Sequence, residues 1–268
     1  MKKYIWFFVC LWCWLLVCVL TENAAVAMAP DPGIRADLES IFSNPPQIQG
    51  YPFQQVMEAA ADRYGLPLPL VLAVARGESF FDPSAKSAKG AVGIMQVLPS
   101  TAADYGVNEK DLLDPEKNID VGVHYLADLY AQIQDPYLTL AAYYCGCSGV
   151  DKENLTLRKD CDEYVRYINT HLRTILARAE AGVPASQVEE NHFVLARFDN
   201  FLDAENFLEF LAGKLPDLSF DTYRREVVHT DHIRYQYQIL AAYGAEKERT
   251  EICRAVEEST GFAFCRFE

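Results

Sequence analysis

The chain has 268 residues, a formal net charge of −14, and hydrophobic residues at 50% of its positions. This length is enough for two domains with their own cores, and the apolar content excludes a chain that is disordered throughout. Because nucleic acids attract clustered Lys and Arg, the acidic balance argues against a nucleic-acid ligand, but it is compatible with an uncharged glycan.

The first 27 residues have the pattern of an export signal. Lys2 and Lys3 form a short positive region, residues 4–20 are a continuous apolar run, and Ala25-Val26-Ala27 fits the small-residue rule for cleavage. The run is at the short limit for a membrane span, which favours a cleaved signal over an uncleaved membrane anchor. We therefore expect the mature protein in the periplasm or cell envelope, where disulfides form.

The middle of the chain has a helical pattern. Residues 28–50 are rich in proline and are expected to form a linker, and helical periodicity dominates over residues 51–182. Capping residues, glycines and prolines mark where helices start and end. These predicted boundaries are Gly65, Pro67, Pro83, Asp114-Pro115, Asp135-Pro136 and Gly182.

Residues 191–268 change to alternating strands and helices. The predicted order is β-α-β-β-α-β, with strands over 192–198, 219–227, 232–243 and 261–267 and helices over 202–215 and 245–259. This order is the split βαβ arrangement of ferredoxin-like folds. The expected fold class is α+β with two domains, in which a small ferredoxin-like domain follows a mainly α-helical one.

Glu78 is the carboxylate that the local sequence singles out. It ends the apolar run PLPLVLAVARGE, and a Gly-rich turn follows it. Desolvation and the negative end of a helix dipole both raise the pKa of a carboxyl group in that position, toward the range where it can protonate a leaving oxygen. Spacing alone leaves open the alternative that Glu78 faces water at a helix end.

Five sequence blocks resemble, in the same order, the catalytic domain of the soluble lytic transglycosylases, which has a lysozyme-like fold and cuts peptidoglycan. The blocks lie within residues 51–182 and read GESFFDPSAKS, GAVGIMQVLPSTA, LLDPEKNIDVGVHYLADL, LAAYYCG and EYVRYI. The resemblance implies cleavage of the MurNAc–GlcNAc β-1,4 bond with 1,6-anhydroMurNAc ends, and it implies Glu78 as the single acid and base. It implies neither a cofactor nor a metal. A lysozyme-like hydrolase and a non-catalytic cell-wall scaffold of a secretion or division machine are the alternatives.

The same blocks imply residues that contact the substrate. Ser79 would hold the sugar or the catalytic glutamate in register, and Gln96 would bind the glycan. Met95 would pack beside the sugar, with a plain core position as the alternative. Peptidoglycan glycan strands are the implied partner, and a protein partner in an envelope complex stays open.

Two tyrosines and two structural positions complete the resemblance. Tyr143 would face Glu78 and hydrogen-bond it, and Tyr164 would line the cleft. Asn118 matches an amide that ties down a loop, and Gly122 matches a glycine for close helix packing. The chain departs from the family pattern at AYYCGCSG, where the family usually reads AYNAGPG, and this puts the substrate preference in doubt more than the reaction.

Five cysteines follow the predicted signal, so at least one stays outside intramolecular bridges. A bridge from Cys161 to Cys147 or Cys145 would staple the loop between them, and a Cys147–Cys161 pair could replace the rigidity of the family's proline. A Cys253–Cys265 bridge would staple the C-terminal domain. The alternative is that these cysteines are small buried hydrophobic residues.

The C-terminal segment, residues 191–268, resembles a SPOR domain, which binds glycan strands of peptidoglycan. The resemblance rests on the β-α-β-β-α-β order, the segment's length and a helix that opens in Asp-Ala-Glu. A ferredoxin-like module of another kind is the alternative, since a fold does not fix a function.

Overall fold

The computed structural model describes residues 28–182, 184–185, 191–230, 232–244 and 246–262. The export signal expected over residues 1–27 lies outside this set. Among the described residues, no helix combines the length and the apolar composition that a membrane crossing requires.

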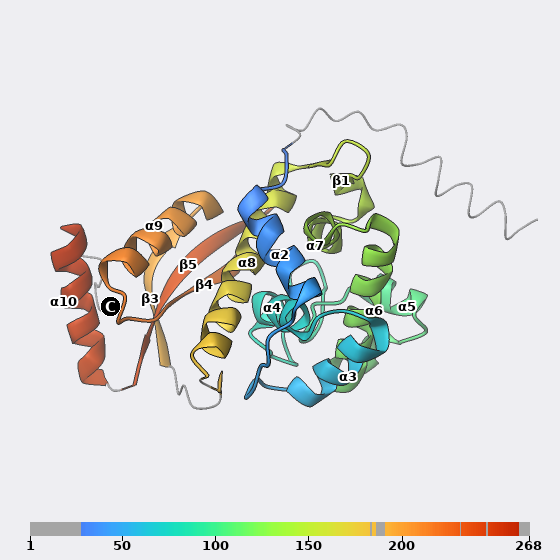
Figure 1. The fold of residues 1–268 in the computed structure, drawn as a ribbon, viewed down its shortest axis with the longest axis horizontal. Coiled ribbons are helices and arrows are strands. Elements are labelled where there is room, and N and C mark those ends of the chain that lie inside the picture. Colours follow the sequence, from blue (N-terminus) through green and yellow to red (C-terminus); the bar gives the residue numbers. More distant parts are fainter. Residues whose placement is uncertain (1–27, 183, 186–190, 231, 245, 263–268) are drawn as a thin grey trace, which may run out of the picture.

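Helices dominate residues 28–182 (Figure 1). Gly65 caps the second of them, and the side chains of Asp114 and Asp135 cap two others, as predicted. The elements are α2 (Pro32–Ser43), α3 (Gln54–Tyr64), α4 (Leu68–Ser79), α5 (Pro99–Asp104), η1 (Glu109–Leu113), α6 (Pro115–Ile133), α7 (Pro136–Cys145), η2 (Cys147–Gly149), β1 (Val150–Asp151), β2 (Thr156–Leu157) and α8 (Lys159–Glu180).

The linker expected over residues 28–50 is wrong in its middle, where α2 forms. Asp31 accepts hydrogen bonds from the backbone N–H groups of Gly33 and Ile34, and Pro32 occupies the first turn. Ile34, Leu38 and Ile41 are buried, and α2 packs on α7 and α4. An apolar stripe at helical spacing therefore outweighs the proline content of this segment.

α4 is the central helix of the helical part. All residues from Pro69 to Gly77 are buried, which is the pattern of a helix covered on every side. α8 packs against α4, and in Figure 1 it lies between the sheet and the other helices. Because Glu78 is the penultimate residue of α4, this packing fixes its position.

The C-terminal part is a sheet with helices. β3 (Asn191–Phe198), α9 (Phe201–Lys214), β4 (Phe220–Val228), β5 (Ile233–Tyr243) and α10 (Glu246–Thr260) follow each other. The sheet order is β3-β5-β4, and both pairings are antiparallel. β5 therefore lies between two strands that α9 connects, which is a split βαβ unit. The last predicted strand falls almost entirely on residues 263–268, outside the described set, so the complete ferredoxin-like order stays a prediction.

The two parts share one continuous hydrophobic core. Within the described residues, β4 is an edge strand of the sheet, and it packs against α8. On β5, Tyr237 points inward and its ring lies 5.2 Å from that of Phe201 and 6.2 Å from that of Tyr167. Glycan binding by the C-terminal part as a separate module stays a prediction. The helical part already packs against the β4 edge of its sheet.

Candidate active site

A cavity of about 710 Å³ lies where the end of α4 meets the sheet. Both parts of the chain supply its walls. The helical part contributes residues from α4, from the loop after it, from α6 and from the end of α7. The sheet contributes six residues, namely Tyr223, Arg224, Arg225, Glu226, Val228 and Tyr235.

Glu78 is a cavity-wall residue whose side chain is only 9% exposed. Its Oε1 accepts a hydrogen bond of 2.6 Å from the hydroxyl of Tyr164. Burial raises the pKa of Glu78 above its ordinary value, and nearby Glu226 adds to this, whereas Arg224 and the Tyr164 hydroxyl pull it down. The net effect is a raised pKa, as a general acid requires.

Arg224 of β4 reaches Glu78 from the other part of the chain. Its Nη2 lies 3.6 Å from Oε2 of Glu78, and its side chain is 8% exposed. Four tyrosine rings surround the guanidinium at 4.7–5.3 Å, namely Tyr144, Tyr164, Tyr167 and Tyr235. Aromatic faces at this range stabilise a cation, and the pKa of Arg224 is raised despite burial, chiefly through Glu78.

Three residues predicted to contact the substrate take different positions. Gln96 lines the cavity with a left-handed backbone (φ 46°), and its amide donates to the carbonyl groups of Gly93 and Ala85. Ser79 also lines the cavity, but its hydroxyl donates to the Ile94 carbonyl at 2.8 Å. Met95 is fully buried, so the prediction that it packs beside the sugar is wrong and the core alternative holds.

The two tyrosines exchange their expected positions. Tyr164 hydrogen-bonds Glu78 and is fully buried, whereas Tyr143 lines the cavity. The Tyr143 hydroxyl donates to the Met95 carbonyl at 2.7 Å rather than to Glu78. The reason is that α8 passes directly behind the end of α4, so a residue of α8 meets the carboxyl group first.

Asn118 holds the loop that carries Gln96. Its amide donates to the carbonyl groups of Val92 and Leu112, and its oxygen accepts from the Met95 N–H. A side chain at Gly93, where φ is 76°, would come within 2.4 Å of this amide. A side chain at Gly122 would come within 2.5 Å of Met95. The predictions of a loop-tying amide and of a packing glycine are thus confirmed.

A buried ion pair joins the sheet to α4 two residues before Glu78. Arg76 Nη1 lies 2.8 Å from Asp221 Oδ1, and both side chains are about 5–6% exposed. Burial alone would raise the pKa of Asp221, but Arg76 outweighs this and lowers it to about 2. His171 lies beside the pair with Nδ1 2.6 Å from Arg76 Nη1, and burial together with Arg76 lowers its pKa to about 3, so it is neutral.

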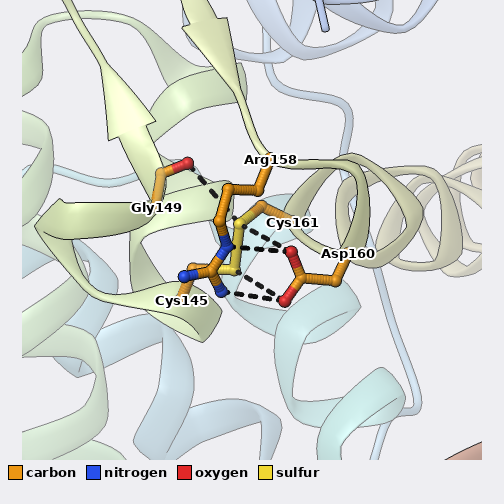
Figure 2. The surroundings of a disulfide bond; sticks show 5 residues. All are labelled: Cys145, Gly149, Arg158, Asp160 and Cys161. Atoms are coloured by element: carbon orange, nitrogen blue, oxygen red, sulfur yellow. Dashed lines mark hydrogen bonds and ion pairs between the residues drawn. A yellow bond between two sulfur atoms is a disulfide. The ribbon is translucent and has the colours of Figure 1, made fainter. Parts of the chain in front are cut away.

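The loop after α7 is fixed by a disulfide between Cys145 and Cys161 (Figure 2). Of the two pairings left open for Cys161, the structure has the one with Cys145, so Cys147 as the partner is wrong. Gly146 has φ 70° and ψ 170°, which turns the chain after α7 so that Cys147 is exposed and takes no part in this bridge. Gly149 packs against the disulfide, since a side chain there would approach Cys145 within 2.4 Å. Cys253 is disulfide-bonded, and Cys265 lies outside the described residues.

The same corner holds a cluster of potential metal ligands among the described residues. Cys145, Asp160 and Cys161 bring one ligand atom each within 4.8 Å of the others. The two sulfur atoms are bonded to each other, and Arg158 donates two hydrogen bonds to the carboxylate of Asp160 (Figure 2). The disulfide thus removes both thiolates that a metal would need.

Sequence reasoning missed the contribution of the sheet. Arg224, Glu226 and Tyr235 reach the cavity only because β4 packs beside α8. Strand register is the signal that could have grouped these three residues. Glu226 pairs with Tyr235 and Arg224 pairs with Tyr237, and paired residues of neighbouring strands share a face of the sheet, so these two pairs lie on one face. Nothing in the local sequence indicates that this face meets α4.

Residues 55–163 match the family model described as the transglycosylase SLT domain. The chain is 41% identical over 101 residues to the membrane-bound lytic murein transglycosylase F of Desulfosudis oleivorans, a match that covers 35% of this chain and 22% of that protein. It is 37% identical over 99 residues to the membrane-bound lytic murein transglycosylase C of Edwardsiella ictaluri, covering 34% and 26%. The chain thus spans about a quarter of the length of these relatives.

Two solved structures are similar to about half of this chain. The lytic transglycosylase Slt of Pseudomonas aeruginosa, in an inactive mutant, aligns with a TM-score of 0.42 and 23% identity, over 51% of this chain and 26% of that one. The 70-kDa soluble lytic transglycosylase of Escherichia coli aligns with a TM-score of 0.40 and 24% identity, over 51% and 27%.

Proposed function

Because residues 55–163 form a transglycosylase SLT domain, we propose that this protein is a peptidoglycan lytic transglycosylase. It cleaves the MurNAc–GlcNAc β-1,4 bond and leaves 1,6-anhydroMurNAc ends. The named relatives are membrane-bound murein transglycosylases, and this supports action outside the cytoplasm, in agreement with the expected export signal.

One observation carries the proposal: Glu78 lies in a cavity wall with its carboxyl group buried and hydrogen-bonded by Tyr164. The raised pKa of Glu78 keeps the group protonated at a higher pH than an exposed glutamate. A protonated carboxylic acid in a cavity of this size is placed to donate to a glycosidic oxygen.

The chemistry then needs a single carboxyl group. Glu78 donates its proton to the glycosidic oxygen as the bond to C1 of MurNAc breaks, and the GlcNAc alcohol leaves. The Glu78 carboxylate next accepts the proton of the MurNAc 6-hydroxyl while that oxygen bonds to C1. Arg224 lies beside the carboxylate during this second half and stabilises its charge.

A glycoside hydrolase is the second candidate, and Glu226 is the observation that favours it. This carboxylate lines the cavity, and its Oε2 accepts a hydrogen bond of 2.6 Å from the Ala88 N–H. A second carboxylate can activate a water molecule in place of the sugar's own hydroxyl. The hydrogen bond to Ala88 also gives Glu226 a structural role, so a carboxylate at this position is compatible with both a hydrolase and a transglycosylase.

Mass spectrometry of digested peptidoglycan separates these functions and the non-catalytic scaffold. Transglycosylase action leaves anhydro ends, hydrolysis leaves reducing ends, and a scaffold releases nothing. A Glu226→Gln variant sharpens the test, because the amide oxygen can still accept from Ala88 but cannot act as a base. We expect anhydro ends from both the wild type and Glu226→Gln. Reducing ends that disappear in Glu226→Gln would establish the hydrolase instead.

A further inference from the structure

The sheet touches both sides of the cavity. On one side, residues 85–91 form the loop lip, where the Ala88 N–H donates to Glu226 and Lys89 Nζ lies 5.4 Å from the ring of Tyr235. On the other side, residues 143–146 form the helix lip at the end of α7. There the ring of Tyr144 lies 6.0 Å from the ring of Tyr235. The guanidinium of Arg224 lies 4.8 Å from the same Tyr144 ring.

Arg224, Glu226 and Tyr235 thus form a barrier from lip to lip, which we call the β4–β5 wall. Its members also support each other, since the Tyr235 hydroxyl lies 3.5 Å from Glu226 and the guanidinium of Arg224 lies 4.7 Å from the Tyr235 ring. A polymer lying in the cavity cannot pass through side chains in mutual contact.

The wall is anchored to the helix that carries Glu78. The buried Arg76–Asp221 pair ties β4 to α4, and a buried pair resists separation because each charge would be left without its partner. The Tyr167 hydroxyl adds a second tie, because it donates to the Gly77 carbonyl and accepts from the Arg224 N–H. These contacts make the wall a fixed part of the cavity rather than a segment that swings with each turnover.

The cavity is also limited in size. About 710 Å³ is within the range of pockets that enclose small ligands, roughly 300–1,000 Å³. A groove that accepts the middle of a long glycan must be open at both ends. Here Arg224, Glu226 and Tyr235 line the same cavity as Glu78, so the β4–β5 wall stands at one of its sides.

We infer that the β4–β5 wall closes one end of the glycan site, so that the enzyme cuts near the ends of strands and releases short units. This inference rests on the proposed function and adds the form of the substrate, a strand end. The C-terminal part then sets where along a strand Glu78 acts, in addition to any binding of the cell wall.

The test uses uncross-linked peptidoglycan strands that keep their stem peptides, in two preparations of equal total mass, one with half the mean length of the other. Halving the length doubles the number of ends. We expect the full-length enzyme to show a twofold higher initial rate on the shorter strands and to release disaccharide-sized product from the first time point. Equal rates on both preparations, with products of every length, would overturn the inference and leave the proposed function intact. If neither preparation gains anhydro ends, the proposed function itself fails.

A variant assigns the effect to the wall. In a Tyr235→Ala, Glu226→Ala double variant we expect longer products and a smaller dependence of the rate on strand length. Arg234→Ala is the matched control, because Arg234 is exposed on β5 and does not line the cavity. If the double variant keeps the wild-type product lengths, the wall does not set them. Should the double variant not fold, the comparison of strand lengths with the wild-type enzyme still decides the inference.

Discussion

Replacing Arg224 by methionine should move the pH dependence of the reaction to higher pH. The side chain keeps much of its volume among the tyrosine rings, but the positive charge next to Glu78 disappears. Nη2 of Arg224 lies 3.6 Å from Oε2 of Glu78. At an effective dielectric constant of about 20, two unit charges at this distance attract each other by about 5 kcal/mol.

This attraction is an upper bound on the shift in the pKa of Glu78. At about 1.4 kcal/mol per pKa unit it corresponds to roughly three and a half units. Opposite charges this close shift carboxyl groups by about one to three units in proteins. Burial already raises the pKa of Glu78 while Arg224 opposes it, so removal of the cation must raise the pKa further.

The assay is kcat/KM against pH on soluble peptidoglycan strands, because this ratio reports the pKa values of the free enzyme. The acid step needs protonated Glu78, so activity is present below its pKa and falls as the pH rises through it. In Arg224→Met the falling limb should lie at least about one unit higher. Arg224→Lys keeps the charge and should leave the limb near its wild-type position.

Arg225→Met is the matched control, since Arg225 is the exposed neighbour on β4 and its loss changes the net charge equally. An unchanged limb in Arg224→Met would refute the reasoning. An equal shift in both methionine variants would refute it too, because it would show a general charge effect.

Glu78→Gln should lower turnover by about 10²–10⁴-fold with an unchanged melting temperature, since the amide keeps the shape but carries no proton to donate; retention of a tenth of the activity would remove Glu78 from its role. Non-reducing mass analysis should find Cys145 linked to Cys161, and Cys161→Ser should reduce the free energy of unfolding by about 3 kcal/mol in denaturant titration. Asp221→Ala should cost about 3–5 kcal/mol because it leaves Arg76 buried without its partner. In the wild type, the stabilisation from Asp221 is complete above its unfolded pKa of about 3.9 and is lost as the pH falls through its folded pKa of about 2. Acid denaturation should therefore show the stability difference between wild type and Asp221→Ala disappearing over this pH range. Equal free energies of unfolding of the wild type and Asp221→Ala at neutral pH would contradict this.

Most helix boundaries follow from local chemistry and were predictable. Asp114 and Asp135 accept from the backbone N–H groups of the helices that they open, and Gly65 takes a left-handed conformation after α3. α2 lies inside the predicted linker although Asp31-Pro32 carries the same start signal, because the proline content of the segment is typical of a linker while its three buried aliphatic residues form a helical stripe.

Family blocks and local pattern also singled out Glu78, Gln96 and Asn118. Gln96 and Asn118 both bond to the loop that follows α4, Gln96 through the Gly93 carbonyl and Asn118 through the Val92 carbonyl and the Met95 N–H. The same information could not assign the partner of Glu78. Tyr143 and Tyr164 are both compatible with that role in sequence, and only the path of α8 behind α4 selects Tyr164.

The sequence by itself determined most of the helical part, the position of Glu78 at the end of α4, and the order of the elements from β3 to α10. Each depends on caps, periodicity and residues close together in the chain. The tertiary structure alone decided that β4 packs beside α8, and this brings Arg224 within 3.6 Å of a residue 146 positions earlier. The docking depends on a buried ion pair and on aromatic surfaces of both parts. Contacts between residues so far apart in the chain leave no periodic signal in the sequence, because each charged or aromatic residue taken alone is indistinguishable from an ordinary surface or core residue.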